Sequence, residues 1–314
     1  INLLVTAFLL PLSVFSQQDL PTDYLPKEFH AGRREALRKL MPAKSVAVVF
    51  AFPEHTYSND VTYPFHQNPD LYYLTGYKEP NSVLLIFKED QQNAEGKSYR
   101  EVFFVQKRDA GAEQWTGRRL GVEGVKKNLG MEMVFNGEAF KDFPLDLSKF
   151  DHLLFDELPS QAKDNPRDAA DLFDLVKLFR EKTGLKPDHD FTLDRSIRAL
   201  PNIPTANFER TKRYYQNLLS RNEQYKQTLL QEFVNLKDTN EFKAFKSKIK
   251  PSRNQELQGL LASLREVKTP EEISLLRKAI NISAAGQREV MKAIHPGMSE
   301  TEIQGLHEFV HRKY

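Results

Sequence analysis

Close to its C-terminal end the chain carries His307, Glu308 and His311 in the arrangement H-E-x-x-H. On a helix, residues four positions apart lie on one face, so both imidazoles could bind one metal ion while the glutamate activates a water molecule. Zinc peptidases use this spacing. A zinc site of that type also needs a third protein ligand, and only three residues follow His311. The motif suggests a zinc site that its surroundings do not support, and we expect a structural helix there.

Composition limits the other kinds of chemistry that the chain could perform. It has 314 residues, of which 40% are hydrophobic and 28% charged, as expected for one large or two ordinary globular domains. The formal net charge of +2 provides no global attraction to nucleic acid or to an anionic membrane. The absence of cysteine excludes disulfides, thiolate metal sites and thiol catalysis. The sequence also contains neither a glycine-rich phosphate loop nor a serine nucleophile elbow.

The first residues have the pattern of a signal peptide. The apolar run from Leu3 to Phe15 is too short to span a bilayer, and polar residues follow it. Val14 and Ser16 match the small residues at −3 and −1 of a cleavage site, which makes Gln17 the expected mature start. Residues 1–16 are therefore predicted to be an incomplete signal peptide, without its Met and its basic region. A buried N-terminal segment is the alternative. An exported protein would be periplasmic or secreted, with no membrane segment after cleavage.

Alternating strand and helix patterns predict an α/β fold. Short apolar runs predict the strands and amphipathic stretches predict the helices. The strands are expected at Val46–Phe52, Leu71–Leu74, Val83–Phe87, Val102–Val105 and Leu153–Phe155, and the helices at Pro26–Met41 and Asp168–Lys182. From Phe208 to Leu264 the pattern is helical and polar, with Lys and Arg interleaved with tyrosines. Acidic residues interrupt that basic face, so a solvated surface is favoured over a nucleic-acid site.

The last segment contains two helix starts. Thr269 with Glu272, and Ser299 with Glu302, each form a capping box. The first helix is predicted to bury an apolar stripe, and the second to face a core; these residues are Ile273, Leu276, Ile280, Met291, Ile294, Ile303, Leu306 and Val310. No later segment is present to complete that core. We therefore expect the sequence to stop inside a C-terminal domain.

Three stretches together resemble aminopeptidase P, a pita-bread metallopeptidase. They are Tyr63–Phe87 with "YPFHQNPDLYYLTGYKEPNSVLLIF", Lys107–Gly121 with "KRDAGAEQWTGRRLG", and Val267–Ile303 with "VKTPEEISLLRKA" and "HPGMSETEI". The first two are specific to aminopeptidase P, and the third is shared with prolidase, creatinase and methionine aminopeptidase. His66 departs from the family pattern, which usually has Arg there.

The resemblance implies an N-terminal domain with a mixed sheet flanked by helices, followed by the first helices of a truncated pita-bread domain. We expect residues 17–265 to form the N-terminal domain, with a helical linker from about residue 205, and residues 266–314 to begin the catalytic domain. The family holds two divalent metal ions, usually manganese, on two Asp, one His and two Glu. The resemblance places all five downstream of this sequence, so we expect no catalytic residue and no metal ligand in this chain, which would be inert alone.

The implied activity of the full-length protein is that of an Xaa-Pro aminopeptidase, which removes the residue before a proline at the second position of a peptide. A specialised site is useful because the Xaa-Pro bond is a tertiary amide with restricted geometry. The resemblance also implies a homo-oligomer, a dimer or tetramer. A prolidase that takes only dipeptides, and a non-catalytic pita-bread relative that acts as a binding module, are the alternatives.

Trp115 is the one residue to which the resemblance assigns a substrate contact. It is the only tryptophan of the chain, in a predicted loop beside Gly117, and in the family the matching residue helps to wall the pocket of a neighbouring subunit. A partly buried anchor is the structural alternative. Arg118 and Arg119 could hold a carboxylate or a neighbouring subunit, although surface ion pairs are the simpler expectation for at least one. Three further carboxylates, on Asp151, Asp156 and Glu157, bracket a strand and are interpreted as charged strand ends.

Overall fold

The computed structural model describes residues 25–314 except 60, 167, 187, 250–252 and 256, so the predicted signal peptide lies outside the described residues. Within them, Lys27–Lys268 and Thr269–Tyr314 fall into two separate compact units, which are described one at a time. No helix of the described part combines the length and the apolarity needed to cross a membrane.

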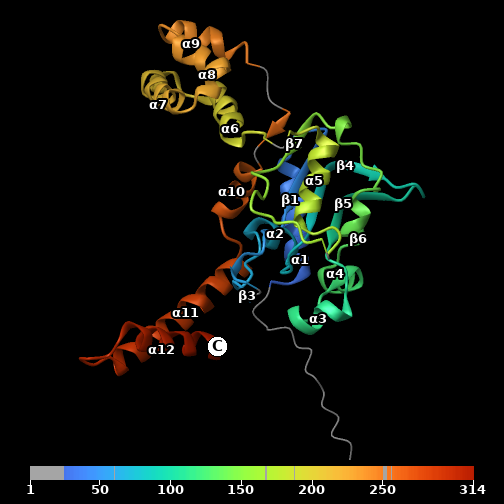
Figure 1. Ribbon diagram of the computed structural model, residues 1–314, viewed down its shortest axis with the longest axis vertical. Coiled ribbons are helices and arrows are strands. Elements are labelled where there is room, and N and C mark those ends of the chain that lie inside the picture. The colour runs from blue at the N-terminus through green and yellow to red at the C-terminus, as the bar shows by residue number, and fades with distance from the viewer. Residues whose placement is uncertain (1–24, 60, 167, 187, 250–252, 256) are drawn as a thin grey trace, which may run out of the picture. The chain divides into compact units, whose positions relative to one another are not determined.

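The larger unit is built on a six-stranded mixed sheet (Figure 1). Its order is β6-β5-β4-β1-β7-β8, and β4 is the strand that runs antiparallel to both its neighbours, whereas the other pairs are parallel. The strands are β1 Ser45–Phe50, β4 Val83–Gln92, β5 Ser98–Val105, β6 Val134–Asn136, β7 His152–Leu154 and β8 Asn254–Gln255. A separate hairpin pairs β2 Thr56–Ser58 with β3 Val61–Thr62. This arrangement confirms the predicted mixed sheet.

Helices cover both faces of this sheet. The helix α5, Leu172–Thr183, packs Leu175, Val176 and Phe179 onto the face that carries Val48 and Leu85. The opposite face carries Glu101 of β5, which pairs with the buried Arg34 of α1. Beside α5, the helices of the sheet domain are α1 Lys27–Leu40, α2 Pro69–Thr75, α3 Ala110–Thr116, α4 Gly121–Leu129 and α10 Gln258–Glu266. Every residue of β1 is buried, which explains why its sequence is a continuous apolar run without alternation.

The prediction of a strand over Leu71–Leu74 is wrong, because these residues lie in α2. The side chain of Asn68 accepts the backbone N–H of Asp70, Pro69 occupies the first turn, and Gly76 ends the helix at φ +73°. A short apolar run with two tyrosines fits a buried helix as well as a strand. The N-cap, the proline and the C-terminal glycine were the signals that separate the two.

A second hydrophobic core lies in the helical region after α5. It is formed by α6 Phe191–Ala199, α7 Phe208–Arg221, α8 Leu229–Asn235 and α9 Thr239–Lys246. Phe233 is at its centre and contacts the rings of Phe208, Tyr215 and Phe242. The helices confirm the predicted pattern, but Tyr215 and Tyr225 are buried in this core rather than solvated. Of the three tyrosines between residues 208 and 264, only Tyr214 is exposed, so these side chains do not form a row on which nucleic-acid bases could stack.

The smaller unit is a pair of helices, α11 Pro270–Ala293 and α12 Glu300–Lys313. Both predicted capping boxes are present, with the hydroxyl of Thr269 accepting from the backbone N–H of Glu272 and that of Ser299 from Glu302. The predicted burial of the α11 stripe is wrong in this chain, since Ile280 is 64% and Met291 74% exposed. A two-helix pair covers only the faces that meet. Val310 is 5% exposed and is the buried apolar residue of α12.

Candidate functional site

The H-E-x-x-H residues lie on α12, but their geometry does not fit a zinc site. The rings of His307 and His311 are 4.5 Å apart between centroids. The Nε2 atom of His307 is buried without a hydrogen-bond partner, because the imidazole lies against Gly286 of α11. A metal ion could reach that nitrogen only if α11 moved away. Glu308 accepts a hydrogen bond from Gln304 at 2.7 Å, as an ordinary pair four residues apart on a helix.

An acidic cluster at the start of α5 was not anticipated from the sequence. Carboxylate oxygens of Asp164, Asp171 and Asp174 lie within 4.8 Å of one another. Asp171 accepts the backbone N–H groups of Asn165 at 2.7 Å and of Asp174 at 3.0 Å, and Asp174 accepts that of Ala170 at 3.1 Å. The pKa of Asp171 is raised, chiefly by burial. These oxygens cap the helix and its preceding loop, and a D-x-x-D pattern at a helix start was the available signal.

Neither candidate set fits the pair of divalent ions that the family resemblance implies. In the H-E-x-x-H set, Nε2 of His307 is buried against α11, and in the acidic cluster Asp171 and Asp174 already accept backbone N–H groups. No step of a reaction is therefore derived through a metal from these residues. The remaining candidate is the exposed aromatic side chain of Trp115.

Trp115 lies on α3, near the end of the helix rather than in a loop. Its side chain is 91% exposed, so the alternative of a partly buried anchor is wrong. The helix begins at Asp109, whose carboxylate accepts the backbone N–H groups of Gly111 and Ala112, both at 2.9 Å. It ends at Gly117, which has φ +82°. A large aromatic ring that buries almost nothing in its own chain is available to contact another molecule.

The two arginines after Trp115 differ sharply in their surroundings. Arg118 is exposed, whereas Arg119 is only 8% exposed. Nη1 of Arg119 donates to the backbone oxygen of Lys107 at 3.3 Å, and its guanidinium faces the amide of Gln106 and the carboxylate of Asp168. With the Gln106 oxygen turned toward the guanidinium, that oxygen accepts from Nη2 at 2.8 Å. Arg119 therefore has a structural role that joins the segments before and after α3, and its ion pair with Asp168 is largely buried rather than on the surface.

A cleft of about 410 Å³ adjoins the base of α3. Among the residues that line it, the carboxylates of Glu54, Glu79 and Asp168 interact with the buried guanidinium of Arg119. Burial raises the pKa of Glu54 and of Glu79, and the positive charge of Arg119 partly offsets this in both. Asp168 raises the pKa of Glu54 further, because two negative charges oppose each other. Glu79 is the best connected of the three, since it accepts the backbone N–H of Leu120 at 2.6 Å and the hydroxyl of Tyr77 at 3.0 Å.

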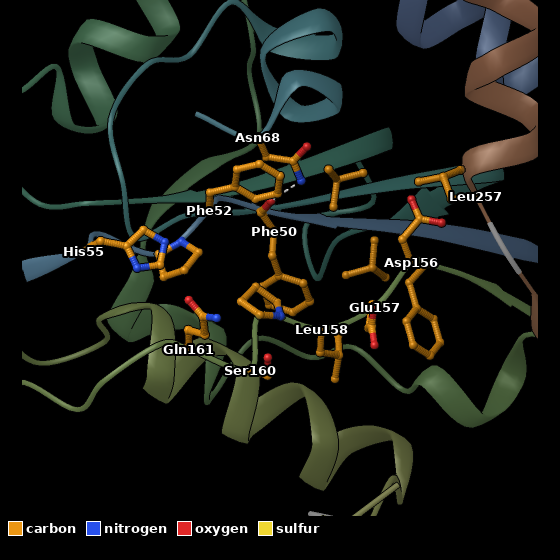
Figure 2. Close-up of a pocket in the computed structure, with 15 residues that line it drawn as sticks. Phe50, Phe52, His55, Asn68, Asp156, Glu157, Leu158, Ser160, Gln161 and Leu257 are labelled. Atoms are coloured by element: carbon orange, nitrogen blue, oxygen red, sulfur yellow. Dashed lines mark hydrogen bonds between the residues drawn. The ribbon is translucent and has the colours of Figure 1, made fainter. Parts of the chain in front are cut away.

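A second cavity, of about 370 Å³, lies at the carboxyl ends of β1 and β7. Figure 2 shows His55 and Gln161 on one side of it and Asp156 with Leu257 on the other. The amide of Asn68 donates to the backbone oxygen of Phe50 at 2.8 Å, drawn as a dashed line in Figure 2. Asp156 accepts the backbone N–H of Gln258 at 2.9 Å. These two side chains tie the connecting segments of the cavity together, which is a structural role.

The remaining residues considered from the sequence are dispersed. Asp151 pairs with Lys44 at 3.5 Å and Glu157 with Arg195 at 3.7 Å, on exposed side chains just outside β7. This agrees with their interpretation as charged strand ends. His66 is exposed, whereas its neighbour Gln67 donates to the backbone oxygen of Glu79 at 2.7 Å. Of this segment, Gln67 is thus the residue connected to the cleft.

Comparison with known proteins identifies what this arrangement resembles. Residues 30–152 match the family model described as aminopeptidase P, N-terminal domain. The Xaa-Pro aminopeptidase of Escherichia coli is 27% identical over 279 residues, which are 88% of this chain and 47% of that protein. That of Haemophilus influenzae is 26% identical over 91% of this chain and 48% of its own length. The chain spans about half the length of these relatives.

Solved structures agree with the sequence comparison. Proline aminopeptidase P II from Yersinia pestis superimposes with a TM-score of 0.58 at 25% identity, over 92% of this chain and 50% of that one. Aminopeptidase P from E. coli with the inhibitor Pro-Leu gives 0.57 at 24% identity, with the same coverage, and shows the shared fold. The likeness extends well beyond the residues matched by the family model.

Proposed function

Since this chain carries an aminopeptidase P N-terminal domain and is related along most of its length to Xaa-Pro aminopeptidases, we propose that it serves as the substrate-contacting and assembly half of such an enzyme. The reaction is hydrolysis of the bond before a proline at the second position of a peptide. The observation that carries the role of this half is the exposure of Trp115 at the end of α3. A prolidase acting on dipeptides is the second enzymatic candidate.

The chemistry of an indole suits the proposed substrate. Its flat apolar face can pack against a proline ring, whose own shape is rigid, with little loss of conformational freedom on either side. Because Trp115 points away from the chain that carries it, we propose that it contacts peptide bound by a neighbouring subunit in a dimer or tetramer. The two divalent ions, manganese in this proposal, belong to the whole protein and are held by residues outside this chain. The chain alone is then without peptidase activity.

Hydrolysis of short peptides by the whole protein tests the reaction. We expect cleavage of a Xaa-Pro-Xaa tripeptide, no cleavage of the matching Xaa-Ala-Xaa peptide, and no activity of the present chain on either. Cleavage of Xaa-Pro dipeptides without any tripeptide cleavage would support prolidase instead. Peptide cleavage that persists after exhaustive chelation would contradict the metal requirement.

Replacement of Trp115 tests the role of this half separately. In the whole protein, Trp115→Ala should raise KM about 10-fold or more, and Trp115→Phe should retain part of the affinity, since a buried aromatic contact contributes of order 1–3 kcal/mol. Tyr214→Ala is the matched control, because Tyr214 is also an exposed aromatic residue, on α7. Equal effects of the two alanine variants would count against a specific contact.

Three further properties are part of the proposal. Sedimentation or light scattering should give a dimer or tetramer of the whole protein. Fractionation of the producing cell should place it outside the cytoplasm, and N-terminal sequencing of the secreted form should start at Gln17. We also propose residues 17–265 as the N-terminal domain, with a helical linker from about residue 205, and residues 266–314 as the beginning of the catalytic one, close to the division between the two compact units.

A further inference from the structure

We infer that Arg119 and Glu79 are positioning residues for Trp115: they join the two stems of the loop that carries α3, so that the exposed indole keeps one direction. This rests on the proposed function only in giving the indole a substrate to meet. The locking of the loop is argued from the contacts of its two ends.

The helix α3 cannot hold the indole in place by itself. It has seven residues, and isolated helices shorter than about 12–15 residues are marginal in water. Trp115 is 91% exposed, so its ring contributes almost no packing to the chain. The order of this segment must therefore come from its ends.

The first fastening joins the beginning of the loop to its end. Arg119 lies twelve positions after Lys107, whose backbone oxygen accepts from its Nη1 atom. Its guanidinium also meets the Gln106 amide, so that the stem before α3 is tied twice to the stem after it. At 8% exposure the guanidinium is largely removed from water, and its planar fork fits several acceptors at once. Lysine, with one point charge, could not replace that set of bonds.

The second fastening joins the loop to the sheet domain. Glu79 accepts the backbone N–H of Leu120 at 2.6 Å. Its other carboxylate oxygen accepts the hydroxyl of Tyr77, which is fully buried and packs edge-on against Phe103 of β5 with ring centroids 5.1 Å apart. The carboxylate therefore transmits the rigidity of the sheet core to the residue that directly follows Arg119.

Two contacts within the loop complete the frame. Arg108 donates to Glu113 through two nitrogens, at 2.9 and 2.7 Å, which ties the first stem to the middle of α3. The aliphatic part of the Arg108 side chain also lies against Gly121, and a Cβ on Gly121 would come within 2.5 Å of Cγ of Arg108. Gly121 has φ +57°, a conformation that favours glycine, so this close approach is built into the backbone.

The chain offers a direct test, because Trp115 is its only tryptophan and its fluorescence reports this one site. Time-resolved anisotropy of the full 314-residue chain separates local motion of the indole from overall tumbling. In the wild type we expect the fast component of the anisotropy decay to be small, which indicates a rigid ring, and quenching by acrylamide to be strong, which indicates an exposed one. Arg119→Lys should increase the amplitude of the fast, nanosecond component about twofold or more, while the indole stays exposed.

Arg118→Lys is the matched control, since it makes the same change at the adjacent, exposed arginine. It should leave the anisotropy unchanged. Glu79→Ala should loosen the indole as Arg119→Lys does, whereas Glu79→Gln, which keeps an oxygen for the Leu120 N–H, should restore most of the rigidity. Far-UV circular dichroism confirms folding, and if Arg119→Lys does not fold, the two Glu79 variants carry the test.

Each outcome decides the inference. A wild-type indole that already moves freely would overturn it, and so would equal loosening by Arg118→Lys and Arg119→Lys. If the Arg119 and Glu79 variants loosen the indole but Trp115→Ala leaves KM of the whole protein unchanged, the positioning holds and the proposed substrate contact fails. If both hold, Arg119→Lys should raise KM in the whole protein and Arg118→Lys should not.

Discussion

Glu79 accepts the backbone N–H of Leu120 at 2.6 Å, although 41 positions separate the two residues. This bond connects the segment after α2 to the end of the loop that carries Trp115. The Glu79 carboxylate accepts this bond although its pKa is raised, chiefly because burial disfavours the charged form. The bonds from Leu120 and Tyr77 and the charge of Arg119 favour its ionised form and offset part of that cost.

The raised pKa of Glu79 predicts a pH dependence with a definite sign. Between the unfolded value of 4.5 and the raised folded value, the folded protein holds more protons than the unfolded chain. The free energy of unfolding that depends on Glu79 therefore falls as the pH rises through this interval, and it is regained as the pH falls. Glu79→Gln removes the titrating group and should remove this contribution.

Urea denaturation of the wild type and Glu79→Gln, from pH 7 down to pH 4.5, measures that contribution. Other carboxylates titrate in the same range, so the difference between the two proteins is the relevant quantity. The wild type should gain stability relative to the variant as the pH falls. A difference that stays constant would show that the pKa of Glu79 is the same in the folded and unfolded states, and a change in the opposite direction would show that folding lowers it; either result contradicts the prediction.

Gly76 is predicted to resist substitution. It has φ +73°, and a Cβ at this position would lie 2.8 Å from Nε2 of His30, whose ring is buried and bonded through Nδ1 to the backbone oxygen of Tyr73. Gly76→Ala should therefore destabilise the protein by about 1–3 kcal/mol. Gly32→Ala, on α1, meets nothing within 4 Å and should stabilise it by up to about 1 kcal/mol. Thermal or urea unfolding distinguishes the two.

Gly286 and Gly305 provide a second matched pair, on the two helices of the smaller unit. A Cβ on Gly286 would come within 2.9 Å of the His307 ring, whereas one on Gly305 would meet nothing within 4 Å. Gly286→Ala should therefore weaken the pairing of α11 with α12 by about 1–2 kcal/mol, and Gly305→Ala should strengthen α12 by up to about 1 kcal/mol. Amide hydrogen exchange of α12 reports both. Faster exchange in Gly305→Ala would contradict the predicted packing.

Metal analysis tests the interpretation of H-E-x-x-H. After dialysis against zinc, the chain should keep far less than one equivalent, because His307 is held against Gly286. His311→Ala should not change that amount. Stoichiometric zinc that disappears in His311→Ala would require α12 to separate from α11, and it would overturn the structural role assigned to this helix.

Much of the fold was predictable where a short stretch of sequence is compatible with only one type of secondary structure. The capping boxes at Thr269 and Ser299 depend on residues three positions apart, and both formed as expected. The apolar run of β1 likewise predicts a buried strand, since its signal does not depend on its partners. Leu71–Leu74 failed because four apolar or aromatic residues have no periodicity that separates strand from helix.

The candidate site was predictable only in part, and for a related reason. Trp115 could be singled out because it is the sole tryptophan and lies in a stretch that resembles aminopeptidase P. The exposure of Trp115 could not be predicted from its position in the sequence. The different burial of Arg118 and Arg119 could not be predicted either, because the two residues are identical and adjacent. That contrast depends on groups outside the pair, such as the backbone oxygen of Lys107, which accepts from Arg119 across 12 positions of the chain, and the carboxylate of Asp168.

The sequence by itself determined the α/β class, the helix starts and the resemblance to aminopeptidase P, because those depend on residue types at short and regular spacings. Only the tertiary structure decided what the functional-looking residues do. In the structure His307 of the H-E-x-x-H motif packs against Gly286. Arg119 is buried and joins the two ends of the loop, whereas Trp115 is exposed to solvent. The physical reason is that burial and hydrogen bonding depend on segments brought together from distant parts of the chain, where a motif carries no information about its surroundings.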